Sequence, residues 1–253
     1  MFDKVDQLRL SVVDSVLKKY PFGEIVVGKS PTGSNPITAD GADFRRATGG
    51  GAFVVIDPSV TCVRGASKAT AAGASSLISI GASTTLDGCS FSINGDHCAI
   101  IIGENCRLKG LTIQVRRANS VVVIGSECTW ESGTILSESG DVVALGNDCM
   151  VSNSVILRTS DGHTIFDACT QEPINLSKDV FIGHHVWLGN SSRVNKGAHV
   201  GSGSVLGQCA IASGKLAENS IFAGTPARKV RDGIVWSRTE HFSNIPDEYL
   251  PVS

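Results

Sequence analysis

The sequence is poor in aromatic residues and carries no excess of basic ones. Aromatic side chains make up 6% of the 253 residues, whereas 28 residues are Gly. This composition favours short strands and tight turns over packed helices. Lys and Arg (22) nearly balance Asp and Glu (24), so no basic surplus is present to bind a phosphate backbone. Nucleic acid is therefore not an expected partner.

Long apolar runs and paired cysteines are also missing. The chain begins MFDKVDQLRL, which is charged at its third residue, unlike a signal peptide. No run approaches the roughly 18 apolar residues that a membrane span needs. We therefore predict no membrane span and a cytoplasmic location. The eight cysteines contain no CxxC pair, so neither a metal site nor a disulfide framework is expected.

What the sequence does contain is a repeat of six residues in its C-terminal half. Aliphatic residues stand six apart at Leu176, Ile182, Leu188, Val194, Val200 and Leu206. Four positions after each of them lies a compact residue: Val180, Val186, Ser192, Ala198, Ser204 and Ala210. A period of six is typical of a coil of three short flat strands with tight corners. Successive coils of this kind stack at roughly the 4.8 Å spacing of hydrogen-bonded strands.

The same pattern continues upstream with longer intervals. Aliphatic residues followed by Gly occur at Ile80, Ile102, Ile124 and Leu145. The compact column four positions later contains Thr84, Cys106, Cys128 and Cys149. We interpret these thiols as buried, reduced and hydrophobic, because a line of cysteines along one edge cannot surround an ion tetrahedrally. The repeats predict an all-β solenoid, a parallel β-helix over residues 80–223.

Two other segments flank the predicted β-helix. Residues 3–20 have apolar positions at helical spacing, ended by Pro21, and predict a helix that caps one open end of the solenoid. Irregular strands and loops are expected from Gly23 to Ser79, so residues 1–79 are predicted to form a capping region. Residues 224–253 are predicted to form a turn and a tail that folds back over the outside.

One interruption breaks the count of six. Leu145, Val151 and Leu157 make one coil, but the next hexads begin only at Leu176. Residues 163–175 are therefore predicted to protrude at a corner, as functional insertions do on otherwise tight scaffolds. The break reads RTSDGHTIFD and carries His163 between two aspartates.

The segments RTSDGH, INLSKDVFIGHHVWLG and AGTPARKV together resemble the hexapeptide-repeat acetyltransferases. Within them, the chain resembles most the bacterial polysaccharide O-acetyltransferases that modify sialic-acid-containing capsules. The resemblance covers Leu145 to about Arg231. It implies a left-handed coil, a homotrimer with sites between neighbouring copies, and direct transfer of an acetyl group from acetyl-CoA to a carbohydrate hydroxyl. Those enzymes more often have Ser where this chain has Gly162.

The resemblance also implies roles for individual residues. His163, 24 residues before Trp187 as in that family, would be the base that deprotonates the acceptor, which suits an imidazole near neutral pH. Trp187 would shape the pocket around the thioester. Either Asp161 or Asp167 could orient the imidazole. A sialic acid acceptor carries a carboxylate, for which Arg158 is the first candidate.

The segment GTPARKVR resembles the part of the family that clamps CoA. Arg228 and Arg231 would supply charge to the phosphates. Aligning the chain with the family without gaps from the VWLG motif implies further CoA contacts at Asn190, Gln208, Ser213 and, displaced by one residue, Lys215. No metal is expected.

Other interpretations remain open. Cys169 could carry the acetyl group covalently, although the resemblance implies direct transfer. The acceptor could be a small molecule, namely an amino sugar, a nucleotide sugar or serine, because an N- or O-acetyltransferase needs the same base. A γ-carbonic-anhydrase-like zinc enzyme uses the same coil, but its paired histidines five apart are missing here. A non-catalytic scaffold is a further class. His184 and His185 are expected at corners that point into solvent.

Overall fold

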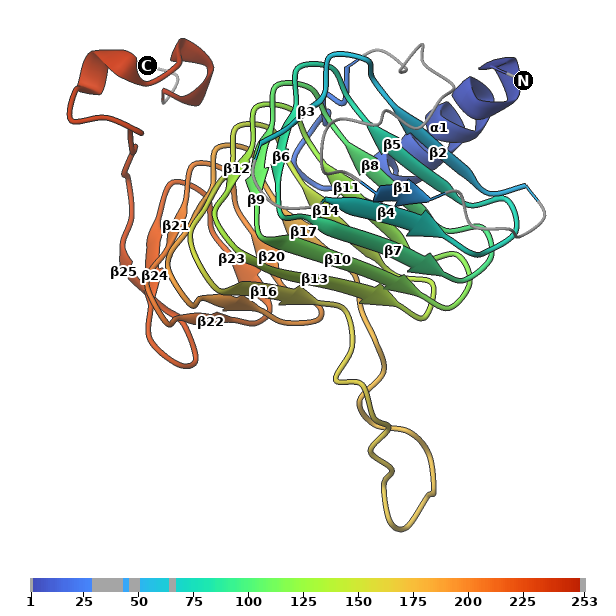
Figure 1. Ribbon diagram of the computed structural model, residues 1–253. Coiled ribbons are helices and arrows are strands. Elements are labelled where there is room, and N and C mark those ends of the chain that lie inside the picture. The colour runs from blue at the N-terminus through green and yellow to red at the C-terminus, as the bar shows by residue number, and fades with distance from the viewer. Residues whose placement is uncertain (1, 29–42, 46–50, 64–66, 251–253) are drawn as a thin grey trace.

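A computed structural model describes residues 2–28, 43–45, 51–63 and 67–250. Within these ranges the chain winds through three sheets that form the faces of a prism (Figure 1). One helix, α1 (Phe2–Leu17), lies beside the prism, and two short 3-10 helices, η1 (Phe242–Asn244) and η2 (Asp247–Tyr249), lie near the C-terminus. None of the helices in the described ranges is long and apolar enough to cross a membrane.

Each coil contributes one strand to each sheet, in the order first, second, third. The first sheet contains β1 (Asp43–Arg45), β4 (Lys68–Ala71), β7 (Ser90–Asn94), β10 (Leu111–Arg116), β13 (Gly133–Glu138), β16 (Val155–Arg158), β19 (Arg193–Val194) and β22 (Ile211–Ala212). The second sheet contains β2 (Phe53–Ile56), β5 (Leu77–Ile80), β8 (Ala99–Ile102), β11 (Val121–Ile124), β14 (Val142–Leu145), β17 (Val180–Ile182), β20 (His199–Val200) and β23 (Lys215–Leu216). The third sheet contains β3 (Thr61–Cys62), β6 (Thr85–Asp87), β9 (Arg107–Lys109), β12 (Thr129–Trp130), β15 (Met150–Val151), β18 (Trp187–Leu188), β21 (Val205–Leu206), β24 (Ile221–Ala223) and β25 (Arg228–Arg231). Strand β25 pairs antiparallel with β24, whereas the other pairs are parallel.

The predicted stacking of the coils is confirmed. Ile80, Ile102, Ile124 and Leu145 lie side by side in the second sheet. The same column continues through Ile182. These side chains are buried in the interior of the prism, so the aliphatic column is the core of the solenoid.

The compact column is confirmed as well. Cys106, Cys128 and Cys149 are buried and free. Each thiol donates to the carbonyl oxygen of a glycine on the next coil, at 3.3, 3.3 and 3.2 Å. Thr84 makes the equivalent hydroxyl contact at 3.0 Å. Small side chains with one donor are therefore suited to this corner, because they satisfy a carbonyl that the turn leaves unpaired.

The prediction that Leu176 belongs to a hexad is wrong. Its side chain is 64% exposed, and the solenoid resumes only at β17. The protruding loop therefore spans residues 159–179, and Figure 1 shows it projecting from the prism. Its neck is closed by the N–H of Lys178, which donates to the carbonyl of Thr159 at 3.0 Å. The loop is inserted without disturbing the register, because Leu145 still pairs with Ile182.

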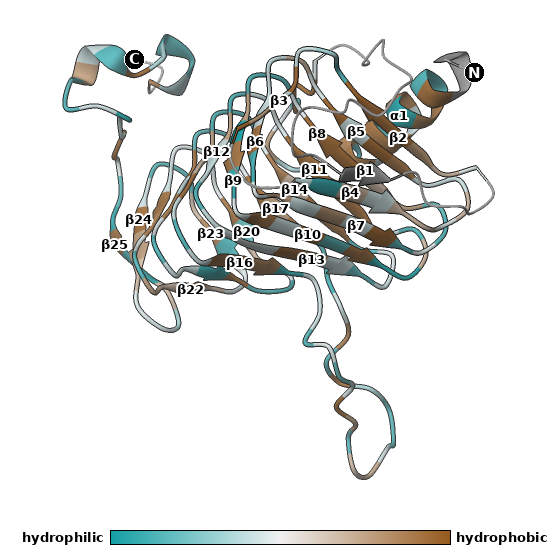
Figure 2. Ribbon diagram, in the orientation of Figure 1, coloured by the Kyte–Doolittle hydropathy of each residue, from teal (hydrophilic) through white to brown (hydrophobic). Residues whose placement is uncertain are grey.

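The prediction that α1 caps an open end is also wrong. Val5 and Val16 of α1 share a buried cluster with Leu77, Ala99 and Ile101, which face outward from the second sheet. The helix thus covers the outer side of that sheet. Strands β5 and β8 are buried over their whole length for this reason, and Figure 2 shows β8 as hydrophobic. A sheet covered on both faces requires such runs.

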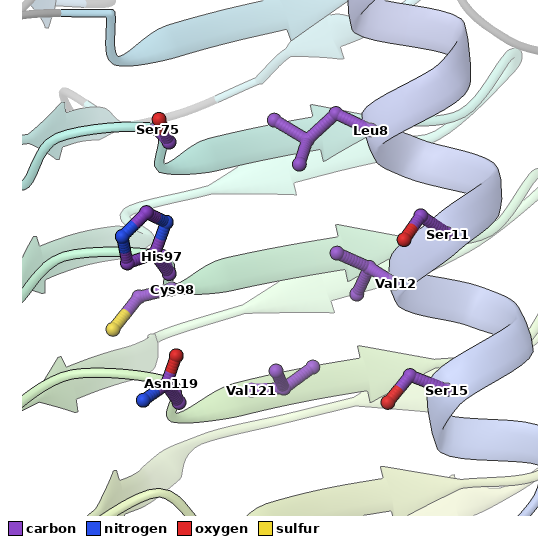
Figure 3. A pocket seen from close by; sticks show the side chains of 9 residues that line it. All are labelled: Leu8, Ser11, Val12, Ser15, Ser75, His97, Cys98, Asn119 and Val121. Carbon is purple, nitrogen blue, oxygen red and sulfur yellow. The ribbon is translucent and has the colours of Figure 1, made fainter.

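Beside α1 the packing leaves a pocket of about 240 Å³. Figure 3 shows Leu8 and Val12 of α1 on one side of it and the turn that carries His97 on the other. The turns that line the pocket lie on the edge between the first and second sheets, at coils that precede the protruding loop.

The solenoid begins earlier than the repeats predict. Strands β2, β3 and β4 pair in register with β5, β6 and β7, so the expectation of irregular structure from Gly23 to Ser79 is wrong for these strands. Strand β5 itself crosses the predicted boundary between residues 79 and 80. Residues 29–42, 46–50 and 64–66 of that segment lie outside the described residues.

Tyr20 ties the segment after α1 to the solenoid. Its hydroxyl donates to the carbonyl of Ile182 at 2.6 Å, and its ring meets Phe22 and Phe181 edge-on at 5.5 and 6.0 Å. Burial raises the pKa of the Tyr20 phenol, so the hydroxyl remains a donor.

We expect Tyr20→Phe to lower the free energy of unfolding by about 1 kcal/mol, since one buried hydrogen bond is lost while the rings still pack. Urea unfolding measures the change. Leu10→Ala, at an exposed position of the same helix, is the control and should change the free energy by less than about 0.5 kcal/mol. Equal stability of Tyr20→Phe and the wild type would contradict the assignment.

Candidate functional site

The protruding loop is a hairpin with a defined tip. Phe166 and Pro173 form an antiparallel bridge. At the tip the carboxylate of Asp167 accepts the N–H groups of Thr170 and Cys169, at 2.8 and 2.9 Å. These backbone donors lower the pKa of Asp167. The carboxylate of Asp167 therefore shapes the tip of the loop.

Asn175 and Lys196 hold the base of the loop in place. The carboxylate of Asp161 accepts hydrogen bonds from Lys196 Nζ and from Asn175 Nδ2, the latter at 3.0 Å. Lys196 also donates to the carbonyl of Asn175 at 2.7 Å. The bond from Lys196, and then that from Asn175, lowers the pKa of Asp161. Asp161 is thus an ionised anchor that ties the loop to the next coil.

His163 stands on this anchored segment with its ring exposed to solvent. Its carbonyl accepts from Asn175 Nδ2 at 2.8 Å, and Asn175 Oδ1 accepts the N–H of Ile165 at 2.7 Å. Gly162, just before it, has a φ of 88°, which favours Gly over residues with a Cβ. Among the described residues no group forms a hydrogen bond with the imidazole. Which aspartate orients the ring remains a prediction.

Arg158 lies where the loop leaves the prism, at the end of β16. Its Nε donates to the carbonyl of Ser160, and the side chain is half-buried. Its charge adds, after Lys196 and Asn175, to the lowering of the pKa of Asp161. The cation predicted to face an acceptor carboxylate is therefore close to the anchored segment.

Trp187 lies on a different side of the prism. It is in β18 of the third sheet, with its side chain 37% exposed between Met150 and Val205. The loop leaves from the edge between the first and second sheets, which is the edge opposite the third face. One chain therefore does not bring His163 and Trp187 together across the prism.

The residues predicted to contact CoA lie on two edges of the prism and at the end of the third sheet. Asn190 and Gln208 lie in stacked turns between the third and first sheets, where the N–H of Cys209 donates to the carbonyl of Asn190 at 2.9 Å. Ser213 lies in a turn between the first and second sheets, on the edge that carries the loop, and Lys215 begins β23 beside it. Exposed Arg228 and Arg231 lie on β25, at the end of the third sheet.

The prediction that His184 and His185 point into solvent is wrong. His185 is 2% exposed, and its Nδ1 lies 2.7 Å from Asp148 Oδ2. His184 is half-buried: its Nε2 lies 2.9 Å from the carbonyl of Phe22, and its Nδ1 accepts the N–H of Asn147. Burial lowers the pKa of His184. Segments from both ends of the chain cover these corners, which the hexad pattern alone does not reveal.

The tail of the chain folds back over the outside, as predicted. Arg238 donates to Asp148 Oδ1 through Nε at 2.9 Å and through one terminal nitrogen at 2.7 Å. Trp236 lies with its ring centroid 6.0 Å from that of Trp187. Sequence reasoning missed Asn175, Lys196 and Trp236 as parts of the site. Only the position of Asn175 at the end of the predicted loop could have drawn attention to it.

No group of three or more His, Cys, Asp or Glu side chains able to hold a metal ion occurs among the described residues. The six histidines of the sequence include His184 and His185, whose ring nitrogens are engaged with protein groups. These two rings therefore present no free ligand pair.

The chain is similar in sequence to known O-acetyltransferases. No protein-family model matches the chain. The chain is 36% identical over 106 residues to a polysialic acid O-acetyltransferase of Escherichia coli O1:K1 / APEC, a match that covers 42% of this chain and 34% of that protein. It is 29% identical over 121 residues to a polysialic acid O-acetyltransferase of Neisseria meningitidis, with 47% and 56% covered. The chain thus spans between a third and a little over half of the length of these curated relatives.

Solved structures give longer matches. The polysialic acid O-acetyltransferase OatWY superposes with a TM-score of 0.72 at 25% identity, over 80% of this chain and 93% of that chain. The polysialic-acid-specific acetyltransferase NeuO gives 0.58 at 28% identity, over 78% and 84%. The predicted fold, a left-handed parallel β-helix of hexapeptide repeats, is confirmed, and so is the resemblance inferred from the three motifs.

We expect Lys196→Gln to raise the pKa of Asp161 toward its ordinary value, because the principal donor to the carboxylate loses its charge. In the wild type the contact favours the ionised carboxylate. It is therefore complete above the ordinary pKa of an aspartate and is lost as the pH falls through the lowered pKa. An NMR titration of the side-chain carboxyl carbons measures this.

Asp232 is the internal control in that titration. Its pKa is lowered by the hydrogen bond from Lys229, on a different part of the molecule, and should not change in the variant. If the titration of Asp161 were the same in both proteins, Lys196 would not be its partner in solution.

Proposed function

We propose that the protein is an acetyl-CoA-dependent O-acetyltransferase that modifies a hydroxyl group of a bacterial surface polysaccharide containing sialic acid. The observation that carries the proposal is His163, an exposed imidazole on a protruding loop whose base is fastened by Asn175, Asp161 and Lys196. The similarity to polysialic acid O-acetyltransferases supports the acceptor class.

The imidazole of His163 would take the proton of the acceptor hydroxyl as the oxygen attacks the acetyl thioester. The new carbon–oxygen bond forms, and the negative charge moves onto the former carbonyl oxygen, which a backbone N–H of the solenoid would stabilise. The carbon–sulfur bond then breaks, and the sulfur leaves with the proton that the imidazole returns. The products are the acetyl ester and CoA, without a covalent enzyme intermediate, so Cys169 has no role.

The site would be completed by a second copy of the chain in a homotrimer. The loop extends away from its own prism (Figure 1), while Trp187 lies on the face opposite the edge from which the loop leaves. The loop also exposes apolar side chains that a neighbouring copy could cover: Ile165, Phe166, Ile174 and Leu176. His163 of one copy would then meet Trp187 of the next.

The division of the CoA contacts fits the same arrangement. Asn190 and Gln208 lie on the edge next to Trp187, whereas Ser213 and Lys215 lie on the edge that carries the loop. CoA would occupy the cleft where these two edges of neighbouring copies face each other. Arg228 and Arg231 would contact its phosphates from the end of the third sheet, where their side chains are exposed. Such a cytoplasmic enzyme would bind its acceptor through Arg158 beside the loop.

We expect His163→Ala to lower acetyl-CoA turnover by about 10²- to 10⁴-fold while acetyl-CoA still binds, because a general base contributes about that factor to the rate. Thiol release measures turnover with polysialic acid, a neutral polysaccharide and free amino sugars, and calorimetry measures acetyl-CoA binding. His241→Ala, at an exposed histidine of the tail, is the matched control and should keep wild-type turnover.

The results of this assay test the base, the acceptor class and the acetyltransferase activity separately. Unchanged turnover in His163→Ala would exclude this residue as the base. Turnover with an amino sugar but with neither polymer would replace the polysaccharide with a small acceptor. Failure of the wild type to bind acetyl-CoA would contradict the acetyltransferase itself.

Subunit mixing tests the composite site. His163→Ala and Trp187→Ala should each be poorly active. A trimer reassembled from equal amounts of both should recover roughly a quarter of the wild-type rate, because random mixing gives that share of interfaces two intact partners. The rate is measured after joint refolding and compared with each variant refolded alone.

Recovery requires that the two residues come from different copies. If each active site took His163 and Trp187 from one chain, the mixed protein would be no more active than the better of the two variants. Analytical ultracentrifugation of the same samples would confirm that trimers have formed.

A further inference from the structure

His185 is enclosed by the C-terminal segment of the chain. Its ring is stacked between those of Trp236 and Tyr249, at centroid distances of 4.0 and 4.4 Å and interplanar angles of 10° and 9°. Its Nε2 lies 2.9 Å from the carbonyl oxygen of Trp236, so this nitrogen carries a proton and donates. Its Nδ1 faces the carboxylate of Asp148. Both ring nitrogens therefore face acceptors, and the two aromatic rings cover both faces of the imidazole.

One further hydrogen bond fixes Trp236 itself. The indole Nε1 donates to the backbone carbonyl of His185 at 2.8 Å, so the two residues exchange a pair of hydrogen bonds as well as stacking. The ring is 7% exposed. Because Trp187 is only two residues after His185, the backbone that carries Trp187 is held directly by Trp236.

Arg238 and Tyr249 hold the segment closed. Arg238 binds Asp148 through two nitrogens and reaches Thr129 Oγ1 at 2.8 Å. Burial alone would raise the pKa of Asp148, but the hydrogen bond from His185 and the charge of Arg238 lower it below its ordinary value. The carboxylate thus joins a cation of the segment to the His185 ring. We call Trp236, Arg238 and Tyr249 the C-terminal clasp.

Through Trp236, the clasp contacts Trp187, the residue that the proposed function places beside the thioester. The rings of Trp236 and Trp187 lie 6.0 Å apart and are tilted by 46°, a contact geometry for aromatic pairs. Trp187 is more than a third exposed, so its ring is partly open to solvent beside Trp236. Within the described residues, no other aromatic ring contacts Trp187.

We propose that Trp236 is a positioning residue of the active site: locked by its reciprocal bonds with His185, it sets the orientation of the Trp187 ring. The proposal rests on the proposed function, in which Trp187 shapes the pocket for the acetyl thioester. Trp236 does not touch the substrates. It acts through Trp187, and its removal lowers turnover more than it lowers the affinity for acetyl-CoA.

The test uses Trp236→Ala and Trp236→Phe in the full-length protein. Trp236→Ala should lower kcat by about tenfold, in line with the cost of misplacing a reacting group, with little change in the KM for acetyl-CoA. Trp236→Phe keeps an aromatic ring against Trp187 but loses the indole N–H that bonds His185, so it should recover part of the loss. Phe242→Ala, at an exposed aromatic residue of the same segment, is the matched control and should keep wild-type kcat.

A double-mutant cycle separates positioning from stability. If Trp236 acts through Trp187, then Trp236→Ala should cause no further loss of kcat in a Trp187→Phe background. Independent, multiplicative losses would overturn the proposal. So would a Trp236→Ala protein that melts earlier but turns over as fast as the wild type when folded.

Fluorescence quenching tests the same contact without enzymatic activity. The chain has three tryptophans, and Trp130 is buried, so in Trp236→Ala the quenchable emission comes from Trp187. The quenching of Trp187 by acrylamide should rise in Trp236→Ala relative to Trp236→Phe, because its ring is freed. Unchanged quenching would overturn the positioning role. If quenching rises but no acceptor is acetylated by the wild type, the positioning stands and the proposed function fails.

Discussion

Parallel hydrogen bonding between successive coils is the constraint on which the rest of the structure depends. It fixes equivalent residues one above another, so that each coil needs only one aliphatic side chain and one small one per hexad to fill the interior. The pairing of Leu145 with Ile182 shows how rigid this register is, since the whole protruding loop is inserted between the two residues. A function can therefore be added at an edge without altering the core.

The edges of the prism are stacked as strictly as its faces. At the edge between the second and third sheets, Asp148 and His185 both have positive φ, of 54° and 49°, and lie on consecutive coils, which brings their side chains into contact. At the edge between the first and second sheets, the same stacking places Lys196 beneath Asp161. Residues 35 or more positions apart thus become neighbours at two edges. One edge supports the loop of His163, and the other holds the tail near Trp187.

The sequence revealed the solenoid because its signal is periodic and local. It also located the loop, the tail and the candidate base. It placed Leu176 wrongly, since an aliphatic residue at the right interval is indistinguishable from a hexad until its burial is known. The coil before residue 80 was missed because Ile56, which pairs with Ile80, is followed by Asp57 rather than by Gly and lies 24 residues before it. The continuously apolar strand β8 was a usable signal that α1 covers the second sheet rather than an open end.

The sequence by itself determined the repeat, hence the parallel coils, and the motif that places His163 and Trp187 24 residues apart. Only the tertiary structure decided that these two residues lie on opposite sides of one prism, that Asn175 and Lys196 hold the loop, and that Trp236 stacks on His185. The physical reason is that a hexad specifies the surroundings of its own residues through the register. Contacts between an edge, an inserted loop and a distant tail depend on side chains that share no period.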